Sequence, residues 1–297
     1  MANLLDLRRR IKSVKNTQQI TKAMKMLSAV NLRRAQTRVV NARPFARKMT
    51  DVLNDLAAHT DENYHHPLLD ARGDERYLLV LITADKGLAG AFNANLIKAA
   101  QAFIGEHAGK TIELMAVGRK GRDFFRRRNA NIVQEYIGLT AKARITYAEA
   151  VEVADDIMRR FIEDETLDKV FIIYNEFRSV LSQRVVVDQL LPVARADVEQ
   201  AEPTTGAQAE TFIEYVYEQP PAEIFGRLLP RFVETQIFRA LLESIASEQG
   251  ARMTAMDSAS KNAGDLISSL TLNMNRIRQA AITKEIIEVV SGAAAAS

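Results

Sequence analysis

The most constraining feature of this sequence is a long C-terminal stretch without proline. From Arg231 to Ser297 only Gly250, Gly264 and Gly292 interrupt residues that favour helices. At 1.5 Å per residue, a helix from Arg231 to Gly292 would be about 90 Å long, whereas the mean helix of a globular protein has about 11–12 residues. No ordinary domain can bury such a helix along one side. We therefore expect it to pair with another helix or to pass through another protein.

The N-terminal sequence offers a partner helix. In both terminal segments, mainly apolar and small residues recur at alternating steps of three and four, which is the spacing of a coiled-coil seam. The N-terminal seam contains Leu4, Leu7, Ile11, Val14, Gln18, Thr21, Lys25, Ser28, Leu32, Ala35, Val39 and Ala42. The C-terminal seam contains Leu242, Ile245, Gln249, Arg252, Met256, Ala259, Ala263, Leu266, Leu270, Asn273, Ile277 and Ala280.

The two seams predict a long coiled coil built from residues 1–60 and 220–297. The alternative is a pair of surface helices on a large helical domain. Polar or small residues occupy the middle of both seams, where a coiled coil selected only for stability would carry Leu or Ile. Pro44 lies within the N-terminal segment, and we expect it to kink that helix or to end it.

Between the terminal segments, patterns typical of strands alternate with patterns typical of helices. Short apolar runs predict buried strands at 77–83, 112–117, 132–136 and 170–174, and helical spacing predicts helices at 92–104, 123–128 and 147–161. We further expect a hairpin-like pair formed by 179–188 and 212–217, and a polar loop at 196–210. This alternation predicts a Rossmann-like α/β domain with a largely parallel sheet over residues 74–218.

Composition excludes several classes of protein. The chain has 297 residues, 47% of them hydrophobic, which is enough for a sizeable core and for two domains. It contains no cysteine, which excludes disulfides, zinc–thiolate sites and thiol catalysis. No apolar run approaches the roughly 20 residues that span a bilayer, and the N-terminus lacks the apolar core of a secretory signal. We therefore expect a soluble protein that acts where it is made.

Positive charge is concentrated at the N-terminus. Residues 1–50 contain thirteen Lys or Arg and one acidic residue, Asp6, so that this segment carries +12 and the remainder −9 in a chain of net charge +3. Such an excess favours an anionic partner, the alternative being a solvated charged face. No aromatic residue precedes Phe45 to stack on bases, so an acidic protein is a better candidate partner than nucleic acid.

Searches for a catalytic or cofactor site in the sequence give weak signals. The segment from Thr83 to Gly90 follows a strand and precedes a helix, but it lacks the glycine and lysine spacing of phosphate-binding loops and reads better as a tight turn. His65 and His66 have no nearby pattern of carboxylates and read as loop residues rather than metal ligands. We therefore expect no cofactor, no metal and no active site of the chain's own.

Four motifs, in order along the chain, resemble the gamma subunit of F-type ATP synthases. The most specific is the C-terminal run Ile282-Thr283-Lys284-Glu285-Ile286-Ile287-Glu288-Val289-Val290-Ser291-Gly292-Ala293. The others are Asn16-Thr17-Gln18 with Ile20-Thr21-Lys22-Ala23-Met24, Asp85-Lys86-Gly87-Leu88 with Gly90, and Ser247-Glu248-Gln249 with Ala251-Arg252-Met253. The resemblance is to the bacterial form, because the cysteine-bearing insertion of chloroplast gamma is absent and no transit peptide precedes the first motif.

The resemblance implies a fold and a set of partners. In this family the terminal helices form an antiparallel shaft inside a ring of three alpha and three beta subunits, and the globular domain contacts the epsilon subunit and the membrane c-ring. Catalysis and nucleotide binding belong to beta with help from alpha, so the resemblance implies a non-catalytic rotor subunit. It also implies a proton-translocating complex with this chain peripheral on the cytoplasmic face of the bacterial membrane. The chain itself does not distinguish protons from sodium ions.

The resemblance also assigns contacts to individual residues. It implies that Arg278 and Gln279 bind a catch loop of beta and that the segment from Ile282 to Gly292, with Thr283 and Glu285, turns in an apolar collar. The remaining predicted contacts are Met24 and Lys25 with acidic lever loops of beta, and Tyr217 and Glu218 with the c-ring. Two rival hypotheses remain open: a DNA-binding coiled-coil protein, and an enzyme whose α/β domain binds a nucleotide.

Overall fold

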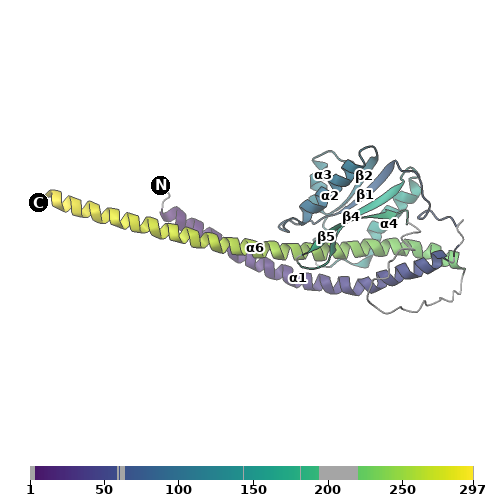
Figure 1. The fold of residues 1–297 in the computed structure, drawn as a ribbon, viewed down its shortest axis with the longest axis horizontal. Helices are drawn as coiled ribbons and strands as arrows, with labels where there is room; N and C mark the ends of the chain where they lie inside the picture. The colour runs from purple at the N-terminus through teal and green to yellow at the C-terminus, as the bar shows by residue number, and fades with distance from the viewer. Residues whose placement is uncertain are drawn as a thin grey trace. The chain divides into compact units, whose positions relative to one another are not determined.

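Two compact units make up the chain. The computed structural model describes residues 4–58, 60, 64–142, 144–180, 182–193 and 220–296. Residues 1–30 and 252–297 form one unit, here called the coil unit, and residues 31–251 form the other, here called the α/β unit. The division falls within the two longest helices, α1 (Leu4–Ala58) and α6 (Pro221–Ala296), which are labelled in Figure 1.

The long terminal helices are confirmed, with one correction at Pro44. Helix α6 is continuous over 76 residues and α1 over 55. Pro44 lies inside α1 and does not end it, contrary to one of the two expected outcomes. The physical reason is packing: Ala46, Leu53 and Leu56 follow the proline on the same helix and are 5%, 1% and 0% exposed. Burial of this following stretch stabilises the helix beyond the residue that lacks a backbone N–H.

A five-stranded sheet forms the centre of the described α/β unit. Its strands are β1 (Arg76–Ile82), β2 (Thr111–Val117), β3 (Ile132–Tyr136), β4 (Lys169–Phe177) and β5 (Gln183–Leu191). They lie in the order β3-β2-β1-β4-β5. The first four strands are parallel and β5 is antiparallel to β4. This order and direction confirm the Rossmann-like α/β fold.

One neighbour of β5 in the sheet is β4. After β4 the Ser179 N–H donates to the carbonyl of Ser182 at 3.0 Å, close to the start of β5. Pairing two strands that are joined by a short turn costs little loop-closure entropy, because this cost grows with the length of the connecting loop. The expected pairing of 179–188 with 212–217 stays a prediction. Residues 212–217 and the predicted loop at 196–210 lie outside the described residues.

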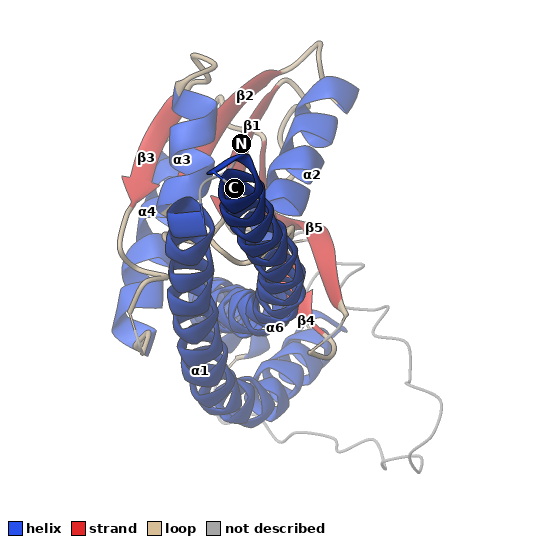
Figure 2. Ribbon diagram, turned by 90° about the vertical axis from the view of Figure 1, so that its left-hand side faces the viewer, coloured by secondary structure: helices blue, strands red, loops and turns tan. Residues whose placement is uncertain are grey.

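Helices cover both faces of the sheet, as Figure 2 shows. Alternate side chains of β1 enter two separate cores, because successive residues of a strand point to opposite faces. One core lies beneath α2 (Phe92–Glu106) and α3 (Arg119–Arg126). The other lies beneath α4 (Tyr147–Glu163) and the parts of α1 and α6 that belong to this unit. Thr146 and Glu149 form a capping box that fixes the start of α4.

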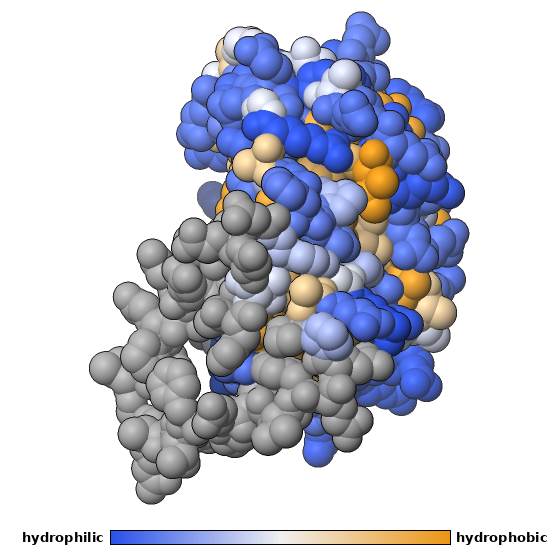
Figure 3. Space-filling model, turned by 90° about the vertical axis from the view of Figure 1, so that its right-hand side faces the viewer, coloured by the Kyte–Doolittle hydropathy of each residue, from blue (hydrophilic) through white to orange (hydrophobic). Residues whose placement is uncertain are grey.

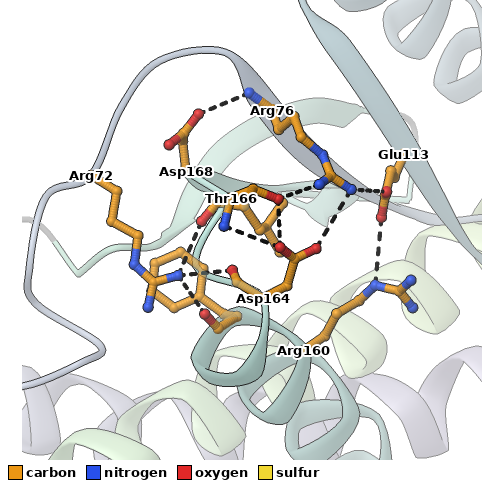
Figure 4. A network of polar contacts seen from close by, with 9 residues as sticks. Arg72, Arg76, Glu113, Arg160, Asp164, Thr166 and Asp168 are labelled. Carbon is orange, nitrogen blue, oxygen red and sulfur yellow. Dashed lines mark hydrogen bonds and ion pairs between the residues drawn. The ribbon is translucent and has the colours of Figure 1, made fainter.

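A polar network fastens the amino ends of the strands (Figure 4). The carboxylate of Asp168, 6% exposed, accepts the backbone N–H groups of Glu75 and Arg76 at 2.7 and 2.8 Å. The Arg76 guanidinium lies 2.6 Å from the buried carboxylate of Glu113. Arg72 donates to the carbonyl of Phe161 in the last turn of α4 and to those of Asp164 and Leu167 beyond it, so one guanidinium holds the end of the helix and the following loop.

Hydrophilic side chains predominate on the face drawn in Figure 3, where the hydrophobic groups form small separate patches. In the part of the chain that the structure describes, no helix combines the length and the hydropathy required to cross a bilayer.

Candidate functional site

The coil unit pairs α1 and α6 along the predicted seam. Leu7, Ile11, Thr21 and Ser28 of α1 are buried, and Val14, Gln18 and Lys25 are half-buried. On α6, Arg252, Met256 and Ala263 are buried. The burial follows the predicted spacing along α1 and along α6 as far as Ala263, which confirms this part of the seam. Beyond it the predicted seam residues Leu266, Asn273 and Ala280 are exposed, so the prediction is wrong at these positions. The small residues Ser28, Ala259 and Ala263 leave little apolar area to hold the two helices together.

Polar contacts across the seam show that the helices run antiparallel. The Gln18 side-chain amide donates to the carbonyl of Ser260 at 3.3 Å, and the Lys25 ammonium lies 2.5 Å from the Asp257 carboxylate. A Cβ atom at Gly264 would lie 3.1 Å from the Gln18 amide nitrogen. Glycine therefore permits close approach at this point. Moving toward the start of α1 corresponds to moving toward the end of α6.

This register leaves the end of α6 as a single helix. Extending the register of the Gln18–Ser260 and Lys25–Asp257 contacts to Leu4, the first described residue of α1, leads to residues close to Arg278. Figure 1 shows α6 extending beyond the N-terminal end of α1. Near this point on α6, Ile277 is half-buried, whereas Arg278 and Gln279 are exposed. The predicted catch residues thus lie where the two-helix coil becomes one helix.

Apolar side chains cover the single-helix end. Ile282, Ile286, Ile287, Val289 and Val290 are 48%, 57%, 58%, 72% and 62% exposed. Large exposed apolar surfaces on a protein mark sites of interaction.

Polar residues accompany the apolar ones at this end. The Thr283 hydroxyl donates to the Gln279 carbonyl at 3.0 Å, and Glu285 is exposed. Lys284 and Glu288 form an exposed ion pair one turn apart, at 3.5 Å.

Lys25 has a partner within the chain. Its ammonium binds Asp257, which also lies 3.2 Å from Lys261. Hydrogen bonds from Lys25 first, and then from Lys261, hold the pKa of Asp257 below its usual range. Met24 is half-buried beside it. Along α6, Asp257 lies about 30 Å from Arg278, so the structure separates the predicted lever-loop residues from the predicted catch residues.

Tyr217 and Glu218, the predicted c-ring contacts, lie outside the described residues. His65 and His66, the weak metal-site signal in the sequence, both make contacts within the chain. His66 accepts the backbone N–H of Leu68 through its Nδ1 at 3.2 Å, and His65 lies 3.4 Å from Asp70. Among the described residues, no group of three or more His, Asp or Glu could hold a metal ion.

Sequence reasoning missed an apolar stripe on the outer side of α1. Ile20, Met26, Leu27 and Val30 are 60%, 58%, 66% and 51% exposed. Ile20 and Leu27 are seven residues apart, and Val30 follows Leu27 by three, so they share one helix face. This second spacing was present in the sequence beside the seam, and it was the signal that could have identified the stripe.

Comparison with known proteins identifies the family. A family model described as ATP synthase matches residues 3–296. The ATP synthase gamma chain of Solibacter usitatus is 52% identical over 299 residues and covers 100% of both chains. That of Geotalea daltonii is 48% identical over 295 residues, which is 99% of this chain and 98% of the relative. This chain belongs to the ATP synthase gamma family.

Chains in solved structures of ATP synthases share the fold of this gamma-family chain. A chain from the central stalk and c-ring structure of the Tetrahymena thermophila mitochondrial ATP synthase is 25% identical, with a TM-score of 0.59, over 81% of this chain and 99% of that one. A chain from the Euglena gracilis mitochondrial ATP synthase has a TM-score of 0.66 at 19% identity, over 98% of this chain and 94% of that one. The second similarity concerns the fold alone.

Proposed function

We propose that this gamma-family chain is the rotating central-stalk subunit of an F-type ATP synthase. Its coil turns inside a ring of three alpha and three beta subunits and couples rotation of the membrane c-ring to ATP synthesis or hydrolysis at beta. The observation that carries the proposal is the end of α6, a single helix whose Ile282, Ile286 and Val289 side chains are exposed. An apolar surface of this kind requires a surrounding partner.

The exposed end suits a rotating contact better than a fixed one. Apolar contact has no directional preference, so a ring of apolar side chains can hold Ile286 and Val290 at every shaft angle. Arg278 and Gln279, at the base of this end, can instead make directional hydrogen bonds with a carboxylate-bearing loop of beta. The apolar segment would act as a bearing and the polar pair as a catch.

Coupling requires the shaft to contact the three beta subunits unequally. A ligand with equal affinity for two states shifts neither population, and the same holds for a shaft that drives conformational change. The coil unit presents different surfaces on different sides, as unequal contact requires. One side of α1 carries the apolar stripe of Ile20, Leu27 and Val30, whereas Lys22 and its exposed basic neighbours carry positive charge that suits acidic lever loops on beta.

The proposal assigns no catalytic site to this chain. Nucleotide chemistry would take place on beta, and the α/β unit would contact the epsilon subunit and the c-ring, with Tyr217 and Glu218 as candidate foot residues. The chain would lie peripherally on the cytoplasmic face of the bacterial membrane. These finer assignments rest on the family resemblance.

Purification and rotation of the native complex test the proposal. We expect an affinity tag on this chain to recover alpha and beta subunits from native membranes in a fixed ratio. A bead attached to the α/β unit should then rotate in one direction when the immobilised complex receives ATP. Recovery of the chain with nucleic acid and without alpha and beta would support the rival binding hypothesis. ATP hydrolysis by the isolated chain would support the enzyme hypothesis.

A further inference from the structure

The turn after β1 contains a buried carboxylate with an unusually complete set of donors. Asp85 is 7% exposed. Its Oδ1 accepts the backbone N–H groups of Arg119 and Gly138, both at 3.0 Å. Its Oδ2 accepts the Thr140 hydroxyl at 2.8 Å and the backbone N–H of Ala141 at 3.1 Å. Each carboxylate oxygen therefore receives two hydrogen bonds.

The donors converge from two segments at the carboxyl edge of the parallel strands. Arg119 is the first residue of α3, directly after β2, and its N–H is one of the groups that a helix N-terminus leaves unpaired. Gly138, Thr140 and Ala141 follow β3. In α/β sheets of this topology ligands bind at this edge, and converging backbone N–H groups form anion sites. The donor set around Asp85 is of that kind.

The backbone beside the carboxylate is closely packed. The Thr140 hydroxyl that donates to the Asp85 carboxylate also accepts the Asp85 backbone N–H at 2.9 Å. A Cβ atom at Gly118, where φ is +97°, would lie 2.1 Å from the Thr83 carbonyl oxygen. The ends of β1 and β2 are therefore packed against each other beside the carboxylate.

We propose that the α/β unit contains an oxyanion site whose resident ligand is the side chain of its own Asp85. The site takes a planar carboxylate, and Asp85 supplies one covalently. A phosphate group would have to displace a buried carboxylate that has four hydrogen bonds, and would meet its negative charge. The filled site occupies the sheet edge at which folds of this topology take their ligands, and the proposal does not depend on the rotary function.

Removing the side chain should convert the filled site into an empty receptor. The group lost in Asp85→Gly is equivalent to acetate, so acetate is the matched external ligand. Hydrogen–deuterium exchange of the full chain reports the site directly through fragments containing 118–122 and 136–142. We expect the amides of Arg119, Gly138 and Ala141 to exchange about tenfold faster in Asp85→Gly, the effect of losing one charged hydrogen bond each. Sodium acetate should restore slow exchange saturably, whereas sodium chloride at equal ionic strength should not.

Asp85→Asn is the matched control, because its side chain fills the same space and leaves no room for acetate. Its exchange should not respond to acetate. If Asp85→Gly fails to fold, Asp85→Ala is refolded with sodium formate, the matching smaller carboxylate, and a higher yield of folded chain than in chloride supports the proposal. Two outcomes would show that Asp85 is a structural contact without a receptor around it. In the first, acetate slows exchange equally in the parent chain, Asp85→Gly and Asp85→Asn. In the second, acetate does not protect Asp85→Gly and formate does not raise the folded yield of Asp85→Ala.

Discussion

Arg43 and Glu243 form a two-pronged ion pair that joins α1 to α6 within the α/β unit. The Arg43 Nε and Nη2 atoms donate to the two Glu243 carboxylate oxygens at 3.0 and 3.2 Å, and Glu243 is 2% exposed. The same carboxylate accepts the backbone N–H of Phe177 at 2.9 Å, and Arg43 donates to the Phe177 carbonyl at 2.9 Å. The pair therefore also fastens the end of β4 to both long helices.

Removing Arg43 should destabilise the α/β unit strongly. Arg43→Met leaves the Glu243 carboxylate buried with one of its two partners, and we expect a loss of about 2–4 kcal/mol in the free energy of unfolding. Urea unfolding of the full chain at low protein concentration measures this loss.

The double variant Arg43→Met, Glu243→Met provides the control for the buried charge. Because it removes both charges, it should be more stable than Arg43→Met alone. If the double variant is instead less stable than Arg43→Met by as much as Glu243→Met alone destabilises the parent chain, the two mutations act independently. That result would show that charge pairing is not the cause of the lost stability.

Spacing along the chain predicted the elements well and their distant contacts poorly. The seam was predictable because apolar and small residues recur at a fixed period, and that period already placed Lys25 on the seam, facing α6. The same residue was expected to face a beta subunit, whereas the structure pairs it with Asp257. The contact with beta stays a prediction.

Contacts between residues far apart in sequence leave no periodic signal. Arg43 and Glu243 are separated by 200 positions, and Asp85 and Thr140 by 55. In the sequence Arg43, Glu243 and Thr140 looked like ordinary polar residues, and Asp85 stood out only as part of a family motif in a turn. The strand at 179–188 is a related case, because alternation identifies a strand but not its neighbour in the sheet, here β4.

Reversing exposed basic charge on α1 should weaken engagement with the acidic ring. Lys22, Arg33 and Arg34 are exposed, whereas Lys25 is excluded because its reversal would also place a carboxylate beside Asp257. One exposed pair contributes about 0–1 kcal/mol, so single reversals to Glu should have little effect and the triple reversal should lower ATP-driven proton pumping. The loss should be larger at low ionic strength, where charges are less screened.

A triple reversal elsewhere on the chain serves as the control. Lys98, Arg127 and Arg144 are exposed in the α/β unit, and their reversal to Glu changes the net charge equally. If both triple variants pump alike, total charge rather than the basic face of α1 determines the effect.

Acid should loosen the turn that begins at His66. Partial burial lowers the pKa of His66, and the nearby Asp70 carboxylate opposes this shift only partly. Because the folded pKa lies below the unfolded value, the unfolded chain binds the proton more readily. The contribution to stability is complete above about pH 6.5 and is lost as the pH falls through the folded pKa. Protonation also removes the Nδ1 lone pair that accepts the Leu68 N–H.

Urea midpoints at pH 7.5 and pH 5 measure the contribution of His66. His66→Asn retains an acceptor for the Leu68 N–H without a titrating group, so its midpoint should fall less on acidification than that of the parent chain. His65→Asn alters an exposed neighbour and should behave as the parent. Equal losses in the parent and in His66→Asn would contradict the assignment.

The catch residues provide the most direct test of how the shaft engages beta. Arg278 and Gln279 are exposed where the coil becomes a single helix, and the Gln279 carbonyl, but not its side chain, is used by Thr283. Replacing both residues with Ala removes the directional donors while favouring the helix, so the shaft should still form. We expect steady-state ATP hydrolysis by the assembled complex to fall at least about tenfold, which corresponds to about 1.4 kcal/mol of lost coupling. Asn275→Ala with Arg276→Ala, half a turn to one turn earlier, should assemble equally and lose much less activity. Wild-type turnover by a normally assembled Arg278→Ala, Gln279→Ala complex would mean that these side chains are only the solvated face of a long helix.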